Sequence, residues 1–158
     1  MVGTMYEGGP LRMVGHATER INWLTDTIKL ALAKSQTNSP TYIPSNETET
    51  SYATIASAME TTNGAGAGYT AGGSTVATPT LAMITDPDDS LRYLKFGGTA
   101  PAPWTSSTFV TEGGVVYDNT ATNKPLICYL DFGVEKDVTA GTLTIVFDAK
   151  GICRLKVI

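Results

Sequence analysis

The chain has 158 residues, a length that can bury the core of one domain without a metal or disulfide to support it. Only 16% of the residues are charged, the formal net charge is −4, and no basic cluster accompanies them, so the charge pattern of nucleic-acid binding proteins is missing. The longest apolar runs are too short to cross a bilayer, which argues against a membrane protein. Threonine and glycine are plentiful, which favours strands and turns and predicts an all-β protein.

Residues 1–19 contain four glycines and a proline and show no hydrophobic period. We expect an extended arm that becomes ordered when it docks against a neighbouring subunit, or else a frayed terminus without a role. The segment lacks the basic-then-apolar pattern of a signal peptide, which predicts assembly in a cytoplasm. Residues 20–158 show no shift in composition and no internal repeat, so we expect them to form a single domain.

The first predicted strand covers residues 27–34. Ile28, Leu30 and Leu32 alternate there with lysine and alanine, and this period of two is typical of a half-buried strand.

Residues 35–47 are rich in Ser, Asn, Thr and Pro and are expected to form a loop. Residues 48–59 then show helical spacing, with a candidate cap at Asn46 or Thr48. We expect a short helix that lies across an open end of the sheets. Its buried face would contain Tyr52, Ile55, Ala56 and Met59.

The glycine-rich segment that follows has neither the lysine of a phosphate-binding loop nor a preceding strand, so we expect a flexible turn. A strand is predicted over residues 74–85. Asp86, Asp88 and Asp89 come next, around a proline, and are expected to form an acidic turn. A weakly bound surface cation is the alternative, although the other ligands of a calcium loop do not follow.

Further strands are predicted over residues 91–96, 107–110 and 114–118. The connection between the first two is rich in Pro and Gly and ends near Trp104, which we expect to plug one end of the core. Between the last two, Glu112-Gly113-Gly114 indicates a turn or a bulge.

The stretch 115–158 predicts an antiparallel meander. Alternating apolar residues over 126–132 and 143–147 indicate two strands, joined by a turn at VEKDVTAG, residues 134–141. A tight turn at 148–151 leads into the last strand. Leu126, Cys128, Leu130 and Phe132 are expected on one face, as are Leu143, Ile145 and Phe147. About eight short antiparallel strands with one short helix predict an all-β fold, either a β-sandwich or a jelly-roll-like barrel.

Cys128 and Cys153 are too few for a disulfide framework or a metal site, and both lie in apolar strand patterns. We interpret them as small buried hydrophobes. The alternative is a disulfide bridge, within or between subunits, that forms after the chain has left a reducing cytoplasm.

The chain shows no recognisable catalytic apparatus, and we predict no catalytic, cofactor-binding or metal-binding residues and no enzymatic activity. His16 is the only histidine, and it lies in the N-terminal arm far from either cysteine. The acidic residues of the C-terminal half lie at or near predicted strand ends and turns, where solvated carboxylates are common. They are Asp118, Asp131, Glu135, Asp137 and Asp148.

Three segments resemble, in the same order and at similar separation, a family of small β-rich structural proteins of tailed-bacteriophage virions. They are INWLTDTIKLALAK (21–34), GAGYTAGGSTVATPT (66–80) and the segment from PAPWTSSTFV to GICRLKV (101–157). The chain departs from the family pattern in its longer N-terminal arm and in residues 43–62.

The resemblance implies a virion component, foremost a capsid decoration (cement) protein on the exterior of the major capsid shell. It implies the major capsid protein as partner and association of the chain as a homotrimer. The alternatives are a head–tail connector or other tail-associated protein, or a surface carbohydrate-binding module. The last of these would need an exposed aromatic platform made from Tyr6, Trp104 or Tyr117.

Overall fold

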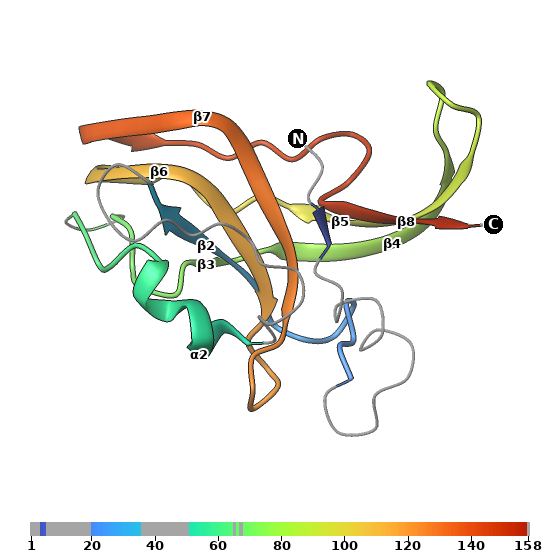
Figure 1. Ribbon diagram of the computed structural model, residues 1–158, viewed down its shortest axis with the longest axis horizontal. Helices are drawn as coiled ribbons and strands as arrows, with labels where there is room; N and C mark the ends of the chain where they lie inside the picture. The colour runs from blue at the N-terminus through green and yellow to red at the C-terminus, as the bar shows by residue number, and fades with distance from the viewer. Residues whose placement is uncertain (1–3, 6–19, 36–50, 65, 67, 158) are drawn as a thin grey trace.

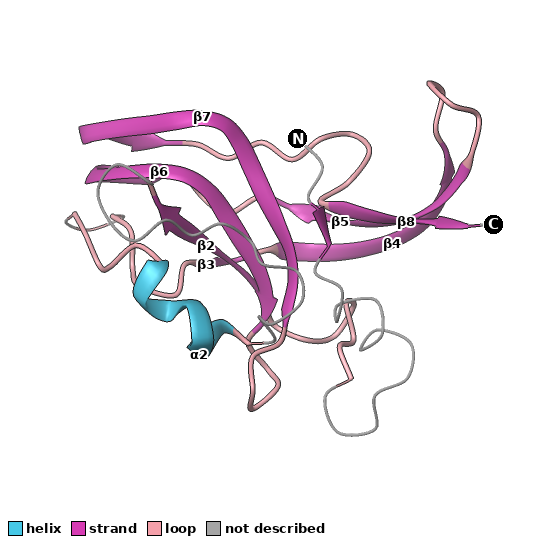
Figure 2. Ribbon diagram, viewed as in Figure 1, coloured by secondary structure: helices cyan, strands magenta, loops and turns pink. Residues whose placement is uncertain are grey.

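The computed structural model describes residues 4–5, 20–35, 51–64, 66 and 68–157. They form two antiparallel sheets and one short helix, which confirms the predicted all-β, sandwich-like fold (Figures 1 and 2). The elements are β1 (Thr4–Met5), β2 (Ile28–Lys34), α2 (Tyr52–Ile55) with a 3-10 turn at Ala56–Ala58, β3 (Ser74–Thr75), β4 (Ala77–Thr85), β5 (Arg92–Thr99), β6 (Trp104–Asp118), β7 (Leu126–Leu143) and β8 (Cys153–Val157).

One sheet has the strand order β1-β7-β6-β2-β3 and the other has the order β4-β5-β8. The sequence pattern over 74–85 predicted one strand, and this was wrong. The chain leaves the five-stranded sheet after β3 and enters the three-stranded sheet at β4. Val76 lies between them, is 1% exposed, and donates its amide to the Ile28 carbonyl at 2.9 Å. The chain therefore crosses from one sheet to the other at a buried residue, Val76, whose backbone is held by β2. The alternation of apolar residues over 74–85 does not reveal this crossing.

The main core lies between the two sheets. Leu30, Val116 and Ile127 from the five-stranded sheet meet Phe96 and Cys153 from the three-stranded sheet there. Full burial of a large aliphatic side chain stabilises a fold by about 1.5–3 kcal/mol, so this inter-sheet cluster is the main source of stability.

Strand β2 is covered on both faces, although its alternation predicted a half-buried strand. Ala31 and Ala33 are as buried as Leu30 and Leu32, because a second cluster covers the outer face of the sheet. In that cluster Ile55 and Met59 pack on the two alanines of β2 and on residues of β6 and β7.

The helix is shorter than predicted and lies elsewhere. It covers the outer face of the five-stranded sheet instead of an open end, and Tyr52 stacks on Tyr117 of β6 with ring centroids 4.3 Å apart. Ile55 and Met59 are buried as expected, whereas Ala56 is exposed. Its predicted first turn, 48–50, and the predicted loop after Ser35 lie outside the described residues.

Strands β6 and β7 take the place of three shorter predicted strands, 107–110, 114–118 and 126–132. The expected break at Glu112-Gly113-Gly114 is a bulge within β6, with a register shift between Thr111 and Gly113. A Cβ at Gly113 would lie 2.7 Å from the Leu130 carbonyl oxygen and would collide with the Tyr129 ring. Glycine is therefore required by the close approach of β7, and it lets the strand continue past the bulge.

The predicted turn at VEKDVTAG was also wrong. These residues belong to β7 and pair with β6, with Asp137 opposite Val110 and Val138 opposite Phe109. Charged residues there are tolerated because this part of β7 is largely exposed, and backbone pairing with β6 decides its conformation.

Residues 144–147, which were expected to be a strand, lie outside all strands. Ile145 and Phe147 still pack against the main core, together with Leu143 at the end of β7. The alternation therefore predicted burial correctly and secondary structure incorrectly. The tight turn at 148–151 is confirmed by the hydrogen bond from the Gly151 amide to the Asp148 carbonyl, 2.9 Å long.

Most of the predicted N-terminal arm lies outside the described residues. Its Thr4 and Met5 form β1, opposite Tyr129 and Cys128 of β7. That part of the arm is an edge strand of this chain's own sheet.

Candidate interaction surface

The hairpin of β4 and β5 extends away from the five-stranded sheet, at the right of Figure 1. Seven backbone pairs join the two strands, from Ala77 opposite Thr99 to Thr85 opposite Arg92. The turn at 86–90 closes the hairpin, as the DPDDS sequence predicted. Because β5 lies between β4 and β8, strand β4 forms one edge of the three-stranded sheet in the part of the chain that the structure describes.

The outer edge of β4 presents backbone groups in a regular order. The Asp86 amide donates to the Leu91 carbonyl at 2.9 Å, so the backbone of residue 86 faces β5. Backbone groups alternate along a strand, so Leu81, Met83 and Thr85 turn their amides and carbonyls outward. Pro79 lies within the register shift between Ala77 and Thr80, where it is paired with no residue of β5, so its missing amide falls at the irregularity. Among the described residues, no strand pairs with this side of β4, so these backbone groups face outward from the sheet.

The same residues carry apolar side chains, and β4 contains no charged residue. Leu81 is 43% exposed and Met83 is 45% exposed, opposite Phe96 and Leu94 of β5. Natural edge strands commonly carry a lysine or another inward charge that blocks pairing. An edge of this length without such a charge is suited to a protein partner.

Beside this edge lies an apolar hollow of about 200 Å³. Trp23 forms part of its wall: it packs edge-on against Phe96 at 5.4 Å between ring centroids and donates its indole N–H to the Gly97 carbonyl at 3.0 Å. Leu24, next along the chain, is 54% exposed at the rim. Ile21, Leu81, Leu94 and Leu155 add to the apolar lining, and Arg20 and Asn22 form its polar part. The hollow and the edge of β4 together form the candidate interaction surface.

Asp86 at the hairpin tip is held by two cations from the C-terminal part of the chain. Its carboxylate is 2% exposed, forms an ion pair with Arg154, and lies 3.0 Å from the Lys150 ammonium. The Arg154 hydrogen bond, above all, holds the pKa of Asp86 far below its ordinary value of 3.8. The alternative of a metal cation bound by Asp86, Asp88 and Asp89 is therefore not favoured. The buried carboxylate of Asp86 already forms ion pairs with Lys150 and Arg154.

The same tip is tied to the outer face of β5. The Tyr93 hydroxyl donates to Asp89 at 2.6 Å, and the Arg154 guanidinium lies over the Tyr93 ring, 4.1 Å from its centroid. These contacts fix the hairpin from the polar face and leave the opposite face, with Leu81 and Met83, available.

Of the three residues considered for the aromatic platform of a carbohydrate-binding module, the two that the structure describes are buried. Trp104 is 3% exposed and packs edge-on against Tyr69, in agreement with its predicted place in the core. Tyr117 is 1% exposed and lies beneath Tyr52. The third candidate, Tyr6, lies outside the described residues.

The acidic residues considered from the sequence do not converge on one site. Asp131, Glu135 and Asp137 follow one another along β7, and Asp148 lies in a turn where its carboxylate accepts the Lys150 amide at 2.8 Å. Among the described residues, no group of three or more His, Cys, Asp or Glu side chains is placed to hold a metal ion.

Asp118 differs from these because it is fully buried at the end of β6. One carboxylate oxygen accepts the Thr120 amide at 2.7 Å, while the other, Oδ2, has no hydrogen-bond partner among the described residues. Burial, followed by the neighbouring Asp26 carboxylate, raises the pKa of Asp118 above its ordinary value of 3.8. The charged form of Asp118 is therefore destabilised in the folded protein.

The two cysteines are both buried, as predicted, and His16 lies outside the described residues. Within the described ranges, no helix is long and apolar enough to cross a membrane.

These features define a sandwich-like all-β domain with an apolar, uncharged edge on a projecting hairpin. No family model, curated protein or solved structure matches the chain.

This surface was not predicted from the sequence, because residues 74–85 have the pattern of one ordinary strand. The signal was present in two properties of the segment: it contains Pro79, which suits an edge strand, and it has no charged residue. Its position at an edge depends on the strand order, which the sequence does not specify.

Proposed function

We propose that this protein is a non-enzymatic structural subunit of a tailed-phage virion, a decoration protein that binds the exterior of the major capsid shell as a homotrimer. The proposal unites the resemblance of three segments to such proteins with one observation of the structure. That observation is the uncharged edge of β4, where Leu81 and Met83 are exposed beside an apolar hollow.

An exposed edge strand binds a partner by adding one of the partner's strands to the sheet. The backbone then supplies the affinity and the alternate side chains supply the specificity. In β4 the outward backbone groups and the exposed apolar side chains belong to the same residues, so one approaching segment would engage both. Three such edges in a trimer would raise the apparent affinity for a symmetric shell by multivalency.

The rest of the domain suits a subunit that must hold this edge in place. The ion pair of Asp86 with Arg154 fixes the hairpin tip to β8, and Trp23 fixes the base of the hairpin through Gly97. A rigid edge reduces the ordering that must accompany docking and so favours binding.

The test is the number and position of copies in purified virions, measured by quantitative mass spectrometry and by cryo-electron microscopy. A decoration protein is expected at a copy number similar to that of the shell subunits, on the outside of the head. A copy number typical of one ring at the portal, or density on the tail, would instead identify a connector or tail protein.

The contribution of the β4 edge is tested by Met83→Lys, with binding to undecorated capsids as the readout. The lysine introduces a charge on an exposed position, so the domain is expected to fold normally and to bind at least tenfold more weakly. Val146→Lys is the matched control, because Val146 is 77% exposed and lies outside both sheets. Equal binding by the two variants would refute a role for this edge.

A further inference from the structure

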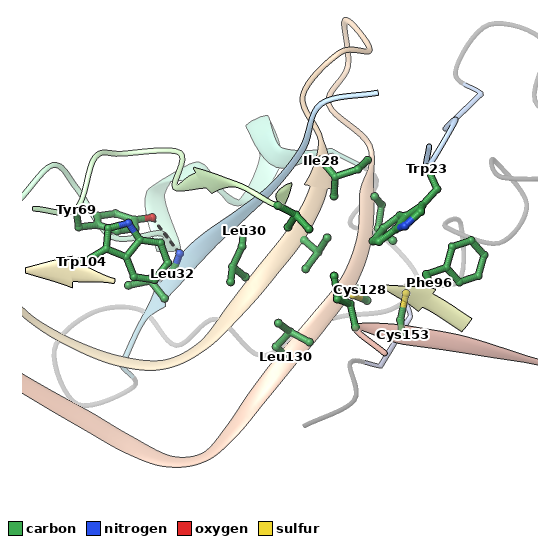
Figure 3. Close-up of a cluster of buried hydrophobic side chains, with 14 of the residues drawn as sticks. Trp23, Ile28, Leu30, Leu32, Tyr69, Phe96, Trp104, Cys128, Leu130 and Cys153 are labelled. Carbon is green, nitrogen blue, oxygen red and sulfur yellow. Dashed lines mark hydrogen bonds between the residues drawn. The ribbon is translucent and has the colours of Figure 1, made fainter. Parts of the chain in front are cut away.

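The only two cysteines of the chain come from opposite sheets and meet in the core. Cys128 belongs to β7 of the five-stranded sheet and Cys153 to β8 of the three-stranded sheet. Both are fully buried and lie in the same cluster, side by side in Figure 3. The Cys153 thiol is near enough to Cys128 to contribute to the raised pKa of the Cys128 thiol.

We propose that Cys128 and Cys153 form an intrachain disulfide when the protein is exposed to a disulfide oxidant, and that this bond joins the two sheets covalently. The sequence left open whether a bridge would lie within or between subunits. The chain has only these two cysteines, and both are wholly buried and lie side by side, so each is the one other thiol within reach in the closed core. An intersubunit bridge would need the core to open and both partners to expose a cysteine. The geometry therefore favours the intrachain bond.

The chemistry balances with a small-molecule disulfide such as oxidised glutathione as oxidant. One cysteine thiolate attacks a glutathione sulfur, which forms a mixed disulfide and expels one glutathione thiolate. The second cysteine thiolate then attacks the protein sulfur of the mixed disulfide and expels the second glutathione. The two thiol protons of the protein are taken up by the two glutathione thiolates. The cysteines are oxidised by two electrons, and glutathione disulfide is reduced by two.

Burial makes this reaction depend on folding. Because the thiolate is the nucleophile, a buried thiol whose pKa is raised by desolvation reacts slowly. In the case of Cys128, burial is the main cause of the raised pKa, and the contact with Cys153 adds to it. Oxidation is therefore expected to be fast while the chain is folding or its core is open, and slow in the native state. A protein made in a reducing cytoplasm would fold with free thiols and form the bond after release.

The bond would add a connection that the backbone does not provide. β7 and β8 belong to different sheets, so no ladder of hydrogen bonds joins them. A cross-link at this point restrains the unfolded chain and also opposes separation of the two sheets. The oxidised protein should therefore resist unfolding better than the reduced protein, with the same fold.

The experiment uses the full chain, refolded from urea either with a glutathione redox mixture or with a phosphine reductant. Oxidation should remove two hydrogen atoms from the mass of the monomer, leave no thiol that can be alkylated in urea, and give a peptide pair containing both cysteines. The urea midpoint should rise on oxidation and return when dithiothreitol is added. For Cys128→Ser and for Cys153→Ser, the urea midpoint of unfolding should be the same after oxidative and reductive refolding.

Thiols that remain fully alkylatable after oxidative refolding would overturn the proposal, as would disulfide-linked dimers in place of the intrachain bond. The comparison of oxidised and reduced wild-type protein is decisive even if a serine variant fails to fold. The inference is independent of the proposed function, since it concerns the isolated chain and needs no capsid.

Discussion

Asp86 and Arg154 are 68 positions apart in the sequence, yet their side chains form an ion pair that ties the tip of the β4–β5 hairpin to the last strand. The carboxylate is almost completely buried, while the guanidinium also lies over Tyr93. This pair connects the candidate interaction surface to the body of the domain.

Asp86→Asn is expected to lower the thermal midpoint at neutral pH, because it leaves Arg154 and Lys150 without their shared carboxylate. The folded pKa of Asp86 lies below its ordinary value of 3.8, so its contribution to stability is present above pH 3.8 and is lost as the pH falls through the folded pKa. The difference in thermal midpoint between wild type and Asp86→Asn should therefore become smaller below pH 3.8. Differential scanning calorimetry across pH measures it. Asp88→Asn, at a carboxylate that is 75% exposed, serves as the control and should have a much smaller effect.

Asp118→Asn should show the opposite dependence on pH. Burial raises the folded pKa of Asp118 above 3.8, so the native state binds the proton more tightly than the unfolded chain, and stability falls as the pH rises from 3.8 through the folded pKa. Asparagine is isosteric and has no charge to desolvate. We expect the variant to gain stability relative to wild type between pH 3 and pH 7, measured by urea unfolding at each pH. A constant difference over that range would contradict the assignment.

Leu130→Ala tests the inter-sheet core. The side chain is 1% exposed within the main cluster, and its truncation should cost about 2–5 kcal/mol of unfolding free energy. Val146→Ala, at a position that is 77% exposed, should change the free energy by no more than about 0.5 kcal/mol. Urea denaturation of both variants provides the comparison. Similar losses in the two would mean that residue 130 is not in the core.

Gly113→Ala tests the bulge in β6. The added methyl group would meet the Tyr129 ring and lie 2.7 Å from the Leu130 carbonyl oxygen, so β6 and β7 would have to move apart. We expect the free energy of unfolding to fall by about 1–3 kcal/mol, which is typical of an overpacked core. Gly141→Ala, in the same pair of strands, has its nearest contact at 3.3 Å and should cost less. Both are measured by urea unfolding, and equal costs would show that the bulge tolerates a side chain.

The sequence predicted those strands whose pattern is set by local burial. Alternation located β2 and β8 to within a residue or two, and the acidic turn at 86–90 followed from proline and aspartate. Composition was sufficient for the all-β class, because threonine and glycine act locally through strand and turn preferences.

Long-range pairing explains most of the errors. Residues 134–141 have the composition of a turn, but they extend β7 because β6 offers a continuous partner. The predicted shared face of Leu126 with Cys128 and Leu130 was wrong. Leu126 lies in the outer cluster, whereas Cys128 and Leu130 lie in the inter-sheet core, and the register shift between Val116 and Tyr117 lies opposite this point of β7. The alternation of apolar residues along one strand does not reveal a register shift, because the shift depends on the neighbouring strand.

The candidate interaction surface and the cysteine pair could not be predicted for a related reason. Whether β4 is an edge or a central strand depends on the order of the strands in the sheet. Contact between Cys128 and Cys153 depends on how the two sheets face one another. Each property comes from tertiary arrangement and leaves little trace in the local sequence.

The strand order also bears on how the chain is made. The neighbours of β2 in the five-stranded sheet are β3 and β6, and β6 begins only at Trp104. During synthesis β2 leaves the ribosome long before this main partner, and that sheet cannot be completed until β7 has followed. Pairing over such separations makes folding slow and keeps an apolar strand unprotected in the meantime. Newly made chains should therefore depend on chaperones until the C-terminal third has emerged.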